Sequence, residues 1–380
     1  MLIAITVYGK NRKDIVYSIS RLLANANVNI VDIEQKVFHG VFIMYLVADY
    51  SKSKLSFDEL KDRLIDECNR LGVNVHVSEF RRSRENLYII TVLGKDRVGI
   101  VRDISKILLD HNIDIRSTSL IARDKLISIE FVIDIGELDP NQLKKELKKE
   151  IEGVNLDVVI QPYDKREKRL IVFDMDSTLV DAEIIDEIAK HVGVEEEVKR
   201  ITERAMKGEI DFKTALIERV KLLKGLPVEV LEKIYKNVRL TEGAKELVQA
   251  LKRSGYKVAV VSGGFTYFTE RLKEELGLDY AFGNELEIEN GKLTGRIKGR
   301  IIDAEEKARI IEEIAERECI SKENIVAVGD GANDKIMIEN AGLGIAFNAK
   351  DVLKDVADGT ISKENLIGLA CVLGLFKKKF

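Results

Sequence analysis

The chain has 380 residues, of which 45% are hydrophobic and 33% charged, enough apolar material for two or three packed domains. This composition excludes intrinsic disorder. Sixty-one basic and sixty-five acidic residues leave a net charge of −4, so nucleic acid is not an expected partner. No apolar run is long enough to span a membrane, and the start does not resemble a signal peptide. Three scattered cysteines suit neither a disulfide framework nor a zinc site, so we expect a cytoplasmic protein with reduced thiols.

The first part of the chain contains one unit twice. The stretch MLIAITVYGKNRKDIVYSIS resembles NLYIITVLGKDRVGIVRDIS at a constant offset of 85 positions. In each copy a strand-like run leads through a Gly-Lys turn, at Gly9 or Gly94, into an amphipathic helix. Two strands, a second helix and a last strand follow, which predicts a βαββαβ sheet with two helices on one face and a face or edge left for pairing. We place the units at residues 1–81 and 86–162.

From Leu170 the pattern changes to short apolar runs followed by loops and long helices. This pattern predicts an α/β domain with a buried parallel sheet over residues 169–380. Four strands are expected, at 170–173, 258–261, 325–328 and 344–347. The stretch from about 184 to 240 has a helical period and is too long for one crossover, so we interpret it as an inserted helical cap. Alternating residues around Asn290-Gly291 predict a β-hairpin.

Polar residues stand at the ends of three of these strands. Asp174 and Asp176 follow the first, Ser262-Gly263-Gly264 follows the second, and Asp330 and Asp334 follow the third. Ligands bind at this edge of parallel sheets. Three or four carboxylates at one point tolerate one another only around a cation, and hard oxygen ligands favour Mg²⁺. With a serine, flexible amides and a lysine, such a site binds phosphate and leaves a carboxylate free to attack phosphorus.

Four motifs in order, DMDSTLV, VSGG, a downstream lysine and VGDGAND, resemble those of the haloacid-dehalogenase superfamily from Leu170 to about Lys379. Within it, DSTLVDAEIIDEIA and AVGDGANDKIMIENAGLGIAF most resemble the phosphoserine phosphatase family. The repeated units resemble ACT domains, which are amino-acid-sensing modules. The resemblance implies an α/β fold in which two ferredoxin-like βαββαβ domains precede a Rossmann-like parallel sheet with a helical cap.

The superfamily resemblance also implies roles for the carboxylates. Asp174 would be the nucleophile that takes up the phosphoryl group, and Asp176 would be the general acid and then the general base. Mg²⁺ would be bound by the Asp174 and Asp330 carboxylates and the Asp176 backbone carbonyl. Asp334 is left open, either as a partner of these groups or as the cap of the next helix.

The same resemblance implies a set of substrate-binding residues. Phosphate would be held by Ser262, Gly263 and Lys307, with Asn333 beside it. In the cap, Glu183 would meet the substrate ammonium and Arg219 its carboxylate, with Met206 and Phe212 nearby. Without the resemblance, Glu183 would fit a first-turn acid favoured by the helix dipole, and Arg219 and Lys307 would fit solvated helix faces.

The Gly-Lys turn of the second repeat fits the turn at which ACT domains bind an amino acid. Asp96, Gly99 and Ile100 are the candidate regulatory residues, and L-serine is the expected effector. The first repeat has Asn11 and Asp14 at the positions of Asp96 and Gly99, so a side chain replaces the glycine there. The alternative is that both repeats serve only as dimerisation modules.

Taken with the resemblance, the sequence predicts a Mg²⁺-dependent phosphatase that converts O-phospho-L-serine to L-serine and phosphate, the last step of the phosphorylated route of serine biosynthesis. A homodimer built on the repeats is expected. Two rival functions stay open. One is a phosphotransferase that passes the phosphoryl group to another alcohol. The other is an amino-acid-sensing protein with a vestigial phosphatase domain, against which the presence of both Asp174 and Asp176 argues.

Overall fold

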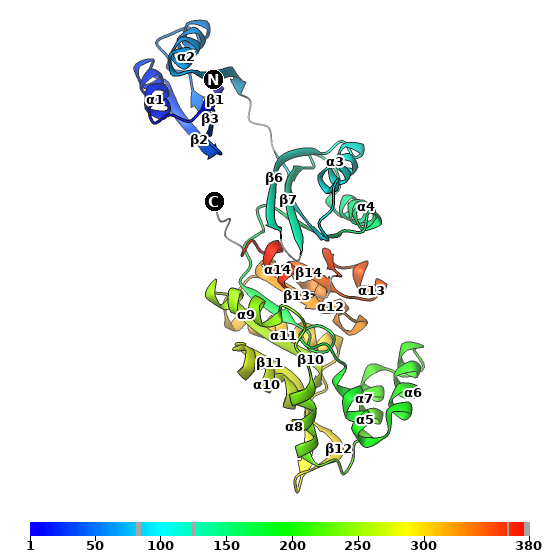
Figure 1. Ribbon diagram of the computed structural model, residues 1–380. Helices are drawn as coiled ribbons and strands as arrows, with labels where there is room; N and C mark the ends of the chain where they lie inside the picture. The colour runs from blue at the N-terminus through cyan, green and yellow to red at the C-terminus, as the bar shows by residue number, and fades with distance from the viewer. Residues whose placement is uncertain (81–84, 124–125, 363–364, 376–380) are drawn as a thin grey trace. The chain divides into compact units, whose positions relative to one another are not determined.

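The computed structural model describes residues 1–80, 85–123, 126–362 and 365–375 (Figure 1). It divides into two compact units, Met1–Arg84 and Glu85–Phe380. Within the described ranges, no helix is both long and apolar enough to cross a membrane.

The first unit is the first repeat. Its elements follow the expected order: β1 (Leu2–Lys10), α1 (Ile15–Asn25), β2 (Asn29–Phe38), β3 (Val41–Asp49), α2 (Phe57–Leu71) and β4 (Val73–Phe80). The sheet is antiparallel with the order β2-β3-β1-β4. Ile19 of α1 and Leu64 of α2 are buried in one core with Ile5 of β1. The βαββαβ prediction is therefore confirmed for this repeat.

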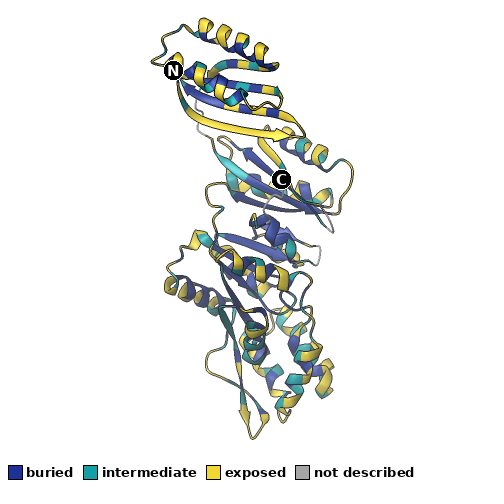
Figure 2. Cartoon of the chain, turned by 60° about the vertical axis from the view of Figure 1, so that its left-hand side comes forward, coloured by how far each residue is buried: buried dark blue, intermediate teal, exposed yellow. Residues whose placement is uncertain are grey.

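Strand β2 forms an open edge of the first unit. Nearly all of its residues are exposed (Figure 2), and they include the large apolar side chains of Ile33, Val37 and Phe38. An edge strand offers unpaired backbone N–H and C=O groups to another chain. The first repeat thus presents a long edge with apolar side chains.

The second unit begins with the second repeat, which has the same fold. Its elements are β5 (Leu87–Gly94), α3 (Ile100–Asp110), β6 (Asp114–Arg123), β7 (Ile127–Asp134), α4 (Pro140–Gly153) and β8 (Asp157–Pro162). These strands lie in the order β6-β7-β5-β8, which matches the first repeat. The prediction is confirmed here too.

The rest of the second unit is a Rossmann-like domain. Its strands are β9 (Leu170–Phe173), β10 (Lys257–Phe265), β11 (Tyr280–Glu289), β12 (Lys292–Lys298), β13 (Ile325–Gly329), β14 (Leu343–Phe347) and β15 (Gly359–Ile361). Six of them pair in parallel in the order β11-β10-β9-β13-β14-β15. The four predicted strands are present, and β11 and β15 extend the parallel sheet beyond the prediction.

Helices cover both faces of this sheet. They are α9 (Ala244–Arg253), α10 (Thr266–Leu276), α11 (Ala304–Arg317), α12 (Lys335–Asn340), α13 (Asp351–Lys354) and α14 (Ile367–Val372), with short 3-10 turns at Lys322–Asn324 and Ala332–Asp334. Successive side chains of β9 point to opposite faces, so Phe173 joins one core with α9, α10 and α14, while Val172 joins the other with α11 and α12. Because both faces of β9 are buried, its sequence is a continuous run of apolar residues.

The cap between β9 and β10 is helical, as predicted. It contains α5 (Ile184–Val192), α6 (Glu195–Met206), α7 (Phe212–Lys221) and α8 (Val228–Asn237). The predicted hairpin is formed by β11 and β12, with Asn290 and Gly291 in left-handed conformations at its turn. The hairpin also hydrogen-bonds to the cap, because Gly225 N donates to Leu293 O at 2.8 Å and Leu293 N to Leu226 O at 2.9 Å.

One sheet runs through both parts of the second unit. Its eleven strands are joined where β15 pairs with β8, antiparallel, at Gly359 and Val159. A Cβ on Gly359 would lie 2.5 Å from Val159 Cγ2, so this close approach requires glycine. Side chains reinforce the junction, since Lys144 Nζ contacts Asp358 Oδ1 at 2.8 Å. The β8 edge of the second repeat is therefore occupied by the neighbouring domain.

Candidate active site

Asp174 stands where β9 opens into its loop and is almost fully buried, with 3% of its surface exposed. Its Oδ1 accepts hydrogen bonds from Met175 N at 2.7 Å and makes an ion pair with Lys307 Nζ at 2.9 Å. Its Oδ2 accepts a longer hydrogen bond from Asn333 Nδ2, at 3.4 Å. One carboxylate oxygen is thus held firmly and the other is freer.

Lys307 lies in the first turns of α11 and is completely buried. Its ammonium contacts Asp174 Oδ1 at 2.9 Å and Asp334 Oδ1 at 2.7 Å. Burial alone would lower the pKa of Lys307, but the charges and hydrogen bonds of Asp174 and Asp334 raise it, so the side chain stays protonated. The solvated-face alternative for Lys307 is therefore wrong.

Asp334 is completely buried behind the loop that follows β13. Its Oδ2 accepts from Asp330 N at 3.2 Å and Gly331 N at 3.1 Å, while its Oδ1 contacts Lys307. A Cβ on Gly329 would come within 2.5 Å of the Asp334 carboxyl carbon, so glycine makes room for it. Although Asp334 precedes α12, its side chain does not cap that helix. Of the two roles left open, it is a partner of the site.

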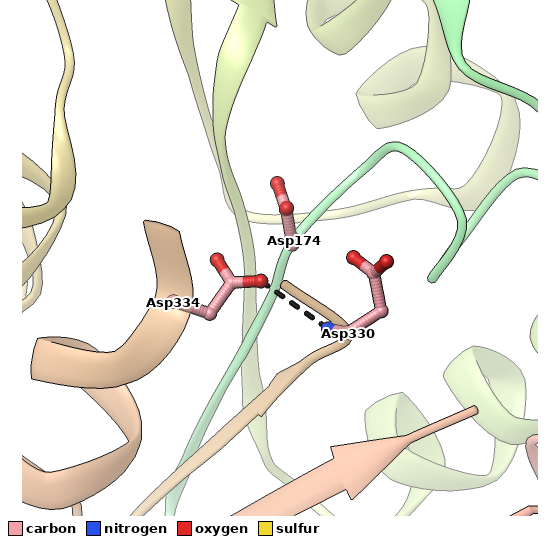
Figure 3. A group of neighbouring side chains, drawn as sticks. All are labelled: Asp174, Asp330 and Asp334. Atoms are coloured by element: carbon pink, nitrogen blue, oxygen red, sulfur yellow. Dashed lines mark hydrogen bonds between the residues drawn. The ribbon is translucent and has the colours of Figure 1, made fainter. Parts of the chain in front are cut away.

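Asp174, Asp330 and Asp334 form one carboxylate cluster (Figure 3), in which one ligand atom from each lies within 4.8 Å of the others. Burial and the charges of Asp334 and Asp174 raise the pKa of Asp330 to about 7. Lys307 contacts two of the three carboxylates, which leaves an excess of negative charge in a buried place. Oxygen ligands with this charge fit a divalent metal ion.

Asp176 and Glu183 lie on either side of a tight turn after β9. Ser177, directly after Asp176, has a φ of +54°, and Ser177 N donates to Ala182 O at 3.2 Å. Asp176 Oδ1 accepts from Ile184 N at 3.0 Å, and Glu183 Oε1 accepts from Ser177 Oγ at 2.9 Å. Burial, Glu183 and Asp174 raise the pKa of Asp176 well above its ordinary value, and burial also raises the pKa of Glu183. Asp176 is therefore suited to carry a proton.

Near its end β10 contains a bulge, Ser262–Gly264, which is shaped by its two glycines. Ser262 is fully buried and its Oγ accepts from Gly264 N at 2.8 Å. A Cβ on Gly263 would lie 2.9 Å from Phe212 Cζ, and one on Gly264 would lie 2.9 Å from Asp176 Oδ2. Side chains at either position would therefore push away a cap residue or a carboxylate.

A cavity of about 630 Å³ joins the sheet edge to the cap. The predicted site residues on its wall are Asp174, Asp176, Glu183, Arg219, Gly263, Asp330 and Asn333, together with Met206 and Phe212. Ser262 and Lys307 are buried beneath this wall. Arg219 comes from α7, and burial lowers its pKa although Asp186 and Glu183 oppose the shift. The structure thus brings all the predicted catalytic and substrate residues to one place.

Asp186 and Lys350 also line the cavity and were not anticipated from the sequence. Asp186 follows Glu183 by one helical turn of α5, a spacing that places both on one side of the helix. Lys350 precedes α13, and its N donates to Asp330 O at 3.2 Å. No sequence signal distinguishes Lys350 from the many other lysines of the chain.

The candidate regulatory turn of the second repeat differs from its counterpart. Gly99, before α3, is left-handed with φ +95°, whereas Asp14, before α1, is right-handed with φ −95°. Asp96 makes an ion pair with Arg123 at 2.8 Å, and Ile100 is buried. The two turns therefore differ in backbone path as well as in sequence.

Comparison with known families and proteins agrees with this geometry. Residues 168–342 match the model of the haloacid dehalogenase-like hydrolases, and residues 1–78 and 88–152 each match an ACT domain model. A phosphoserine phosphatase of Archaeoglobus fulgidus is 65% identical over 349 residues, which cover 89% of this chain and all of the relative. One of Streptomyces coelicolor is 36% identical over 99% of this chain and 92% of its own.

Among solved structures, a phospho-aspartyl intermediate analogue of phosphoserine phosphatase superposes with a TM-score of 0.51 and 52% identity. It covers 56% of this chain and 100% of its own. In that relative, an aspartate carries the phosphoryl analogue.

Proposed function

The chain belongs to the phosphoserine phosphatases, haloacid dehalogenase-like hydrolases with two N-terminal ACT domains, and we propose that it hydrolyses O-phospho-L-serine to L-serine and phosphate. The observation that carries the proposal is the buried convergence of Asp174, Lys307 and Asp334 beneath a cavity walled on its cap side by Glu183 and Arg219. This reaction is the last step of the phosphorylated route to serine.

Asp174 is the proposed nucleophile. Because Lys307 and Met175 N hold Oδ1, Oδ2 is the oxygen free to attack phosphorus. The Oδ2–P bond forms while the bond from phosphorus to the serine oxygen breaks, and Asp176 donates its proton to the leaving oxygen. Water then attacks phosphorus, gives a proton to Asp176, and releases phosphate and the Asp174 carboxylate. The raised pKa of Asp176 supports this acid and base role.

We propose Mg²⁺ as the divalent ion, held by the carboxylates of Asp174 and Asp330 and the backbone carbonyl of Asp176. When bound, Mg²⁺ neutralises charge on the phosphoryl oxygens. Both oxygens of Asp334 are engaged by Lys307 and by the loop N–H groups, which supports a role in orienting Lys307 and the Asp330 loop.

The substrate is held at two ends. Ser262, the Gly263 loop, Lys307 and Asn333 would take the phosphate, since they supply a hydroxyl, backbone amides, an ammonium and an amide around Asp174. Glu183 would take the ammonium of the serine moiety, and Arg219 its carboxylate, because guanidinium and carboxylate pair in a bidentate, directional way. The position of Glu183 and Arg219 on the cavity wall supports this assignment.

We further propose a homodimer in the cytoplasm, with L-serine as an effector at Asp96, Gly99 and Ile100 of the second repeat. The open apolar edge of β2 supports pairing through the first repeat. Lys144 of α4 contacts Asp358 close to α13, and this contact supports coupling from the second repeat toward Lys350 and the cavity. The free thiols of Cys68, Cys319 and Cys371 fit a reducing compartment.

The test is a panel of phosphomonoesters assayed with Mg²⁺ and, separately, with added acceptor alcohols such as homoserine. We expect phosphoserine to be preferred and phosphate release to equal serine release. A phosphorylated acceptor in place of free phosphate would identify a phosphotransferase. Absence of turnover, with no phosphoryl–enzyme in a single-turnover experiment, would identify a vestigial domain.

A further inference from the structure

Asn284 in β11 is a fully buried polar residue outside the cavity wall. Its Nδ2 donates to Gly263 O at 2.8 Å, and its Oδ1 accepts from Ile302 N at 2.9 Å. Both ends of the side-chain amide are therefore engaged by backbone groups of two other segments. A buried amide is retained without penalty only when it is hydrogen-bonded in this way.

The two segments that Asn284 joins carry the phosphate-handling groups. Gly263 belongs to the bulge Ser262–Gly264 of β10, called the phosphate loop below. Ile302 directly precedes Asp303, which caps the N-terminus of α11 by accepting from Glu306 N at 2.9 Å. Lys307 N donates to Asp303 O at 2.8 Å, so Ile302 leads straight into the turn that presents the ammonium.

The backbone explains why a side chain is needed here. β10 and β11 pair regularly up to Val261 and Phe282, and pairing resumes only at Phe265 and Asn284, with a register shift between them. Residues Ser262–Gly264 of β10 instead bulge out of the ladder opposite the single residue Gly283. The backbone groups of a bulge need partners outside the ladder, so Gly264 N donates to Ser262 Oγ and Gly263 O needs a donor of its own. The Asn284 amide supplies that missing donor.

The cap rests on the same two segments. Phe212 of α7 packs closely on Gly263, since a Cβ on Gly263 would lie 2.9 Å from the Phe212 ring. The next residue, Lys213, contacts the other segment, with Nζ 2.8 Å from Asp303 Oδ2. The spacing between the phosphate loop and the α11 N-terminus therefore also sets where the cap meets the core.

We propose that Asn284 is a positioning residue for phosphoryl transfer, which fixes the distance between the phosphate loop and Lys307 and the platform on which the cap closes. The inference rests on the proposed function, because it assigns those two elements to the phosphate. It predicts that loss of Asn284 impairs the handling of every phosphomonoester alike, since the groups that it orients touch the phosphate and not the alcohol.

The experiment compares two full-length variants. Asn284→Leu removes both hydrogen bonds at similar side-chain size. Gln161→Leu is the control, because Gln161 is equally buried and its Nε2 donates to a backbone carbonyl, Val372 O, at 3.2 Å, in the sheet of the second repeat. Both variants lose a buried amide, so both should unfold at lower denaturant concentration. Only Asn284→Leu should lower kcat, by about 10- to 100-fold, since small misplacements of reacting groups cost about that much.

Two readouts besides kcat separate positioning from mere destabilisation. Beryllofluoride, a phosphoryl mimic, should bind Asn284→Leu more weakly by a factor like that in kcat and bind Gln161→Leu normally. The ratio of kcat/KM for phosphoserine to that for a simple alkyl phosphate should stay within about twofold of wild type in Asn284→Leu. Equal kcat in the two variants, or a changed substrate ratio in Asn284→Leu, would overturn the proposal.

Asn284→Asp gives a second measurement if Asn284→Leu does not fold. A carboxylate can accept from Ile302 N but cannot donate to Gly263 O, whereas a protonated carboxyl can do both. Its kcat relative to wild type should therefore rise as the pH is lowered, and a pH-independent ratio would contradict the proposal. Wild-type turnover of phosphoserine in the same assays reports on the proposed function separately.

Discussion

Acidic side chains follow β-strands both at the edge of the parallel sheet and at the strand-to-helix turn of the first repeat. At the sheet edge Asp174 and Asp334 are buried and share one buried lysine. At the turn after β1, 46% of the Asp14 side chain is exposed, and Asp14 pairs at 2.7 Å with Arg12, two residues earlier, which lowers the pKa of Asp14. Both regions contain carboxylates, so the difference between a reactive carboxylate and one in an ordinary surface ion pair comes from burial.

Removing one carboxylate from each region tests this difference most directly. Asp174→Asn should abolish measurable turnover, because the amide cannot form the phosphoryl–aspartate bond, while substrate still binds. The matched change Asp14→Asn should leave kcat unchanged, since an exposed pair contributes little. Kinetics of phosphate release, with a burst measurement, check both. A normal burst in Asp174→Asn would refute the assignment of the nucleophile.

Asp176→Asn should have the next largest effect. The variant keeps the hydrogen bond from Ile184 N but cannot supply or remove a proton, so kcat should fall by about 10²- to 10⁴-fold. The loss should be smaller for a phosphomonoester whose leaving group is a weak base and needs no proton. A pH–rate profile with two such substrates measures this, and equal losses for both would argue against the acid role.

Arg219→Lys keeps the charge but loses the planar pair with a carboxylate. We expect kcat/KM for phosphoserine to fall by about 10- to 100-fold, on the scale of a charged hydrogen bond. The value for a simple alkyl phosphate should change by less than about twofold. Arg12→Lys, at the exposed turn, is the control and should change neither substrate. If Arg219→Ala preserved the preference for phosphoserine over a simple alkyl phosphate, Arg219 would not be the residue that binds the substrate carboxylate.

The carboxylate cluster should make the metal-free protein sensitive to pH. Asp330 has a pKa raised from 3.8 to about 7, so the folded chain binds more protons than the unfolded chain in that window and loses stability as the pH rises through it. In chelator, Tm should therefore fall across this range, and Asp330→Asn should reduce the fall. Mg²⁺ should raise Tm more at high pH than at low pH, by a difference of about 2–6 °C. Calorimetric scans in matched buffers check this; an equal Mg²⁺ effect at both pH values would contradict it.

The smallest expected effect concerns the two repeats. Gly99→Asp should remove L-serine binding from the full chain, because Gly99 has a left-handed backbone that aspartate adopts only with strain. Asp14→Gly, the reciprocal change, should leave serine affinity unaltered. Isothermal titration measures both, and any coupling to activity should be on the order of 5- to 150-fold in affinity. Equal losses in the two variants, or no binding to wild type, would leave the repeats as dimerisation modules.

Much of the fold could be predicted because it depends on local pattern. The offset repeat predicted two βαββαβ units, and both are confirmed. Asn290-Gly291 predicted the hairpin between β11 and β12 for the same reason, since two adjacent residues at positive φ define its turn. The strand β15 and the parallel pairing of the first half of β11 were missed, because these apolar stretches are very short or mixed with polar residues.

The candidate site was predicted as a set of strand ends with converging carboxylates, but the buried hydrogen bonds that support it were not. DMDSTLV and VGDGAND indicated where carboxylates stand along the chain, because parallel strands end at a common edge. Asn284 carries no comparable signal: it is one asparagine in a hairpin strand, and only the bulge beside Gly263 makes its amide necessary.

The amino-acid sequence is enough to predict which elements form and which residues stand at their ends, since periodicity, turn residues and motif order are local properties. Tertiary packing, in contrast, places Lys307, in a helix full of exposed charges, wholly buried between Asp174 and Asp334. It also decided that β8 of the second repeat joins β15 at Gly359, so that one sheet connects a candidate sensor to a candidate active site. Burial and strand partners between distant segments depend on how the whole chain packs, and no local pattern encodes them.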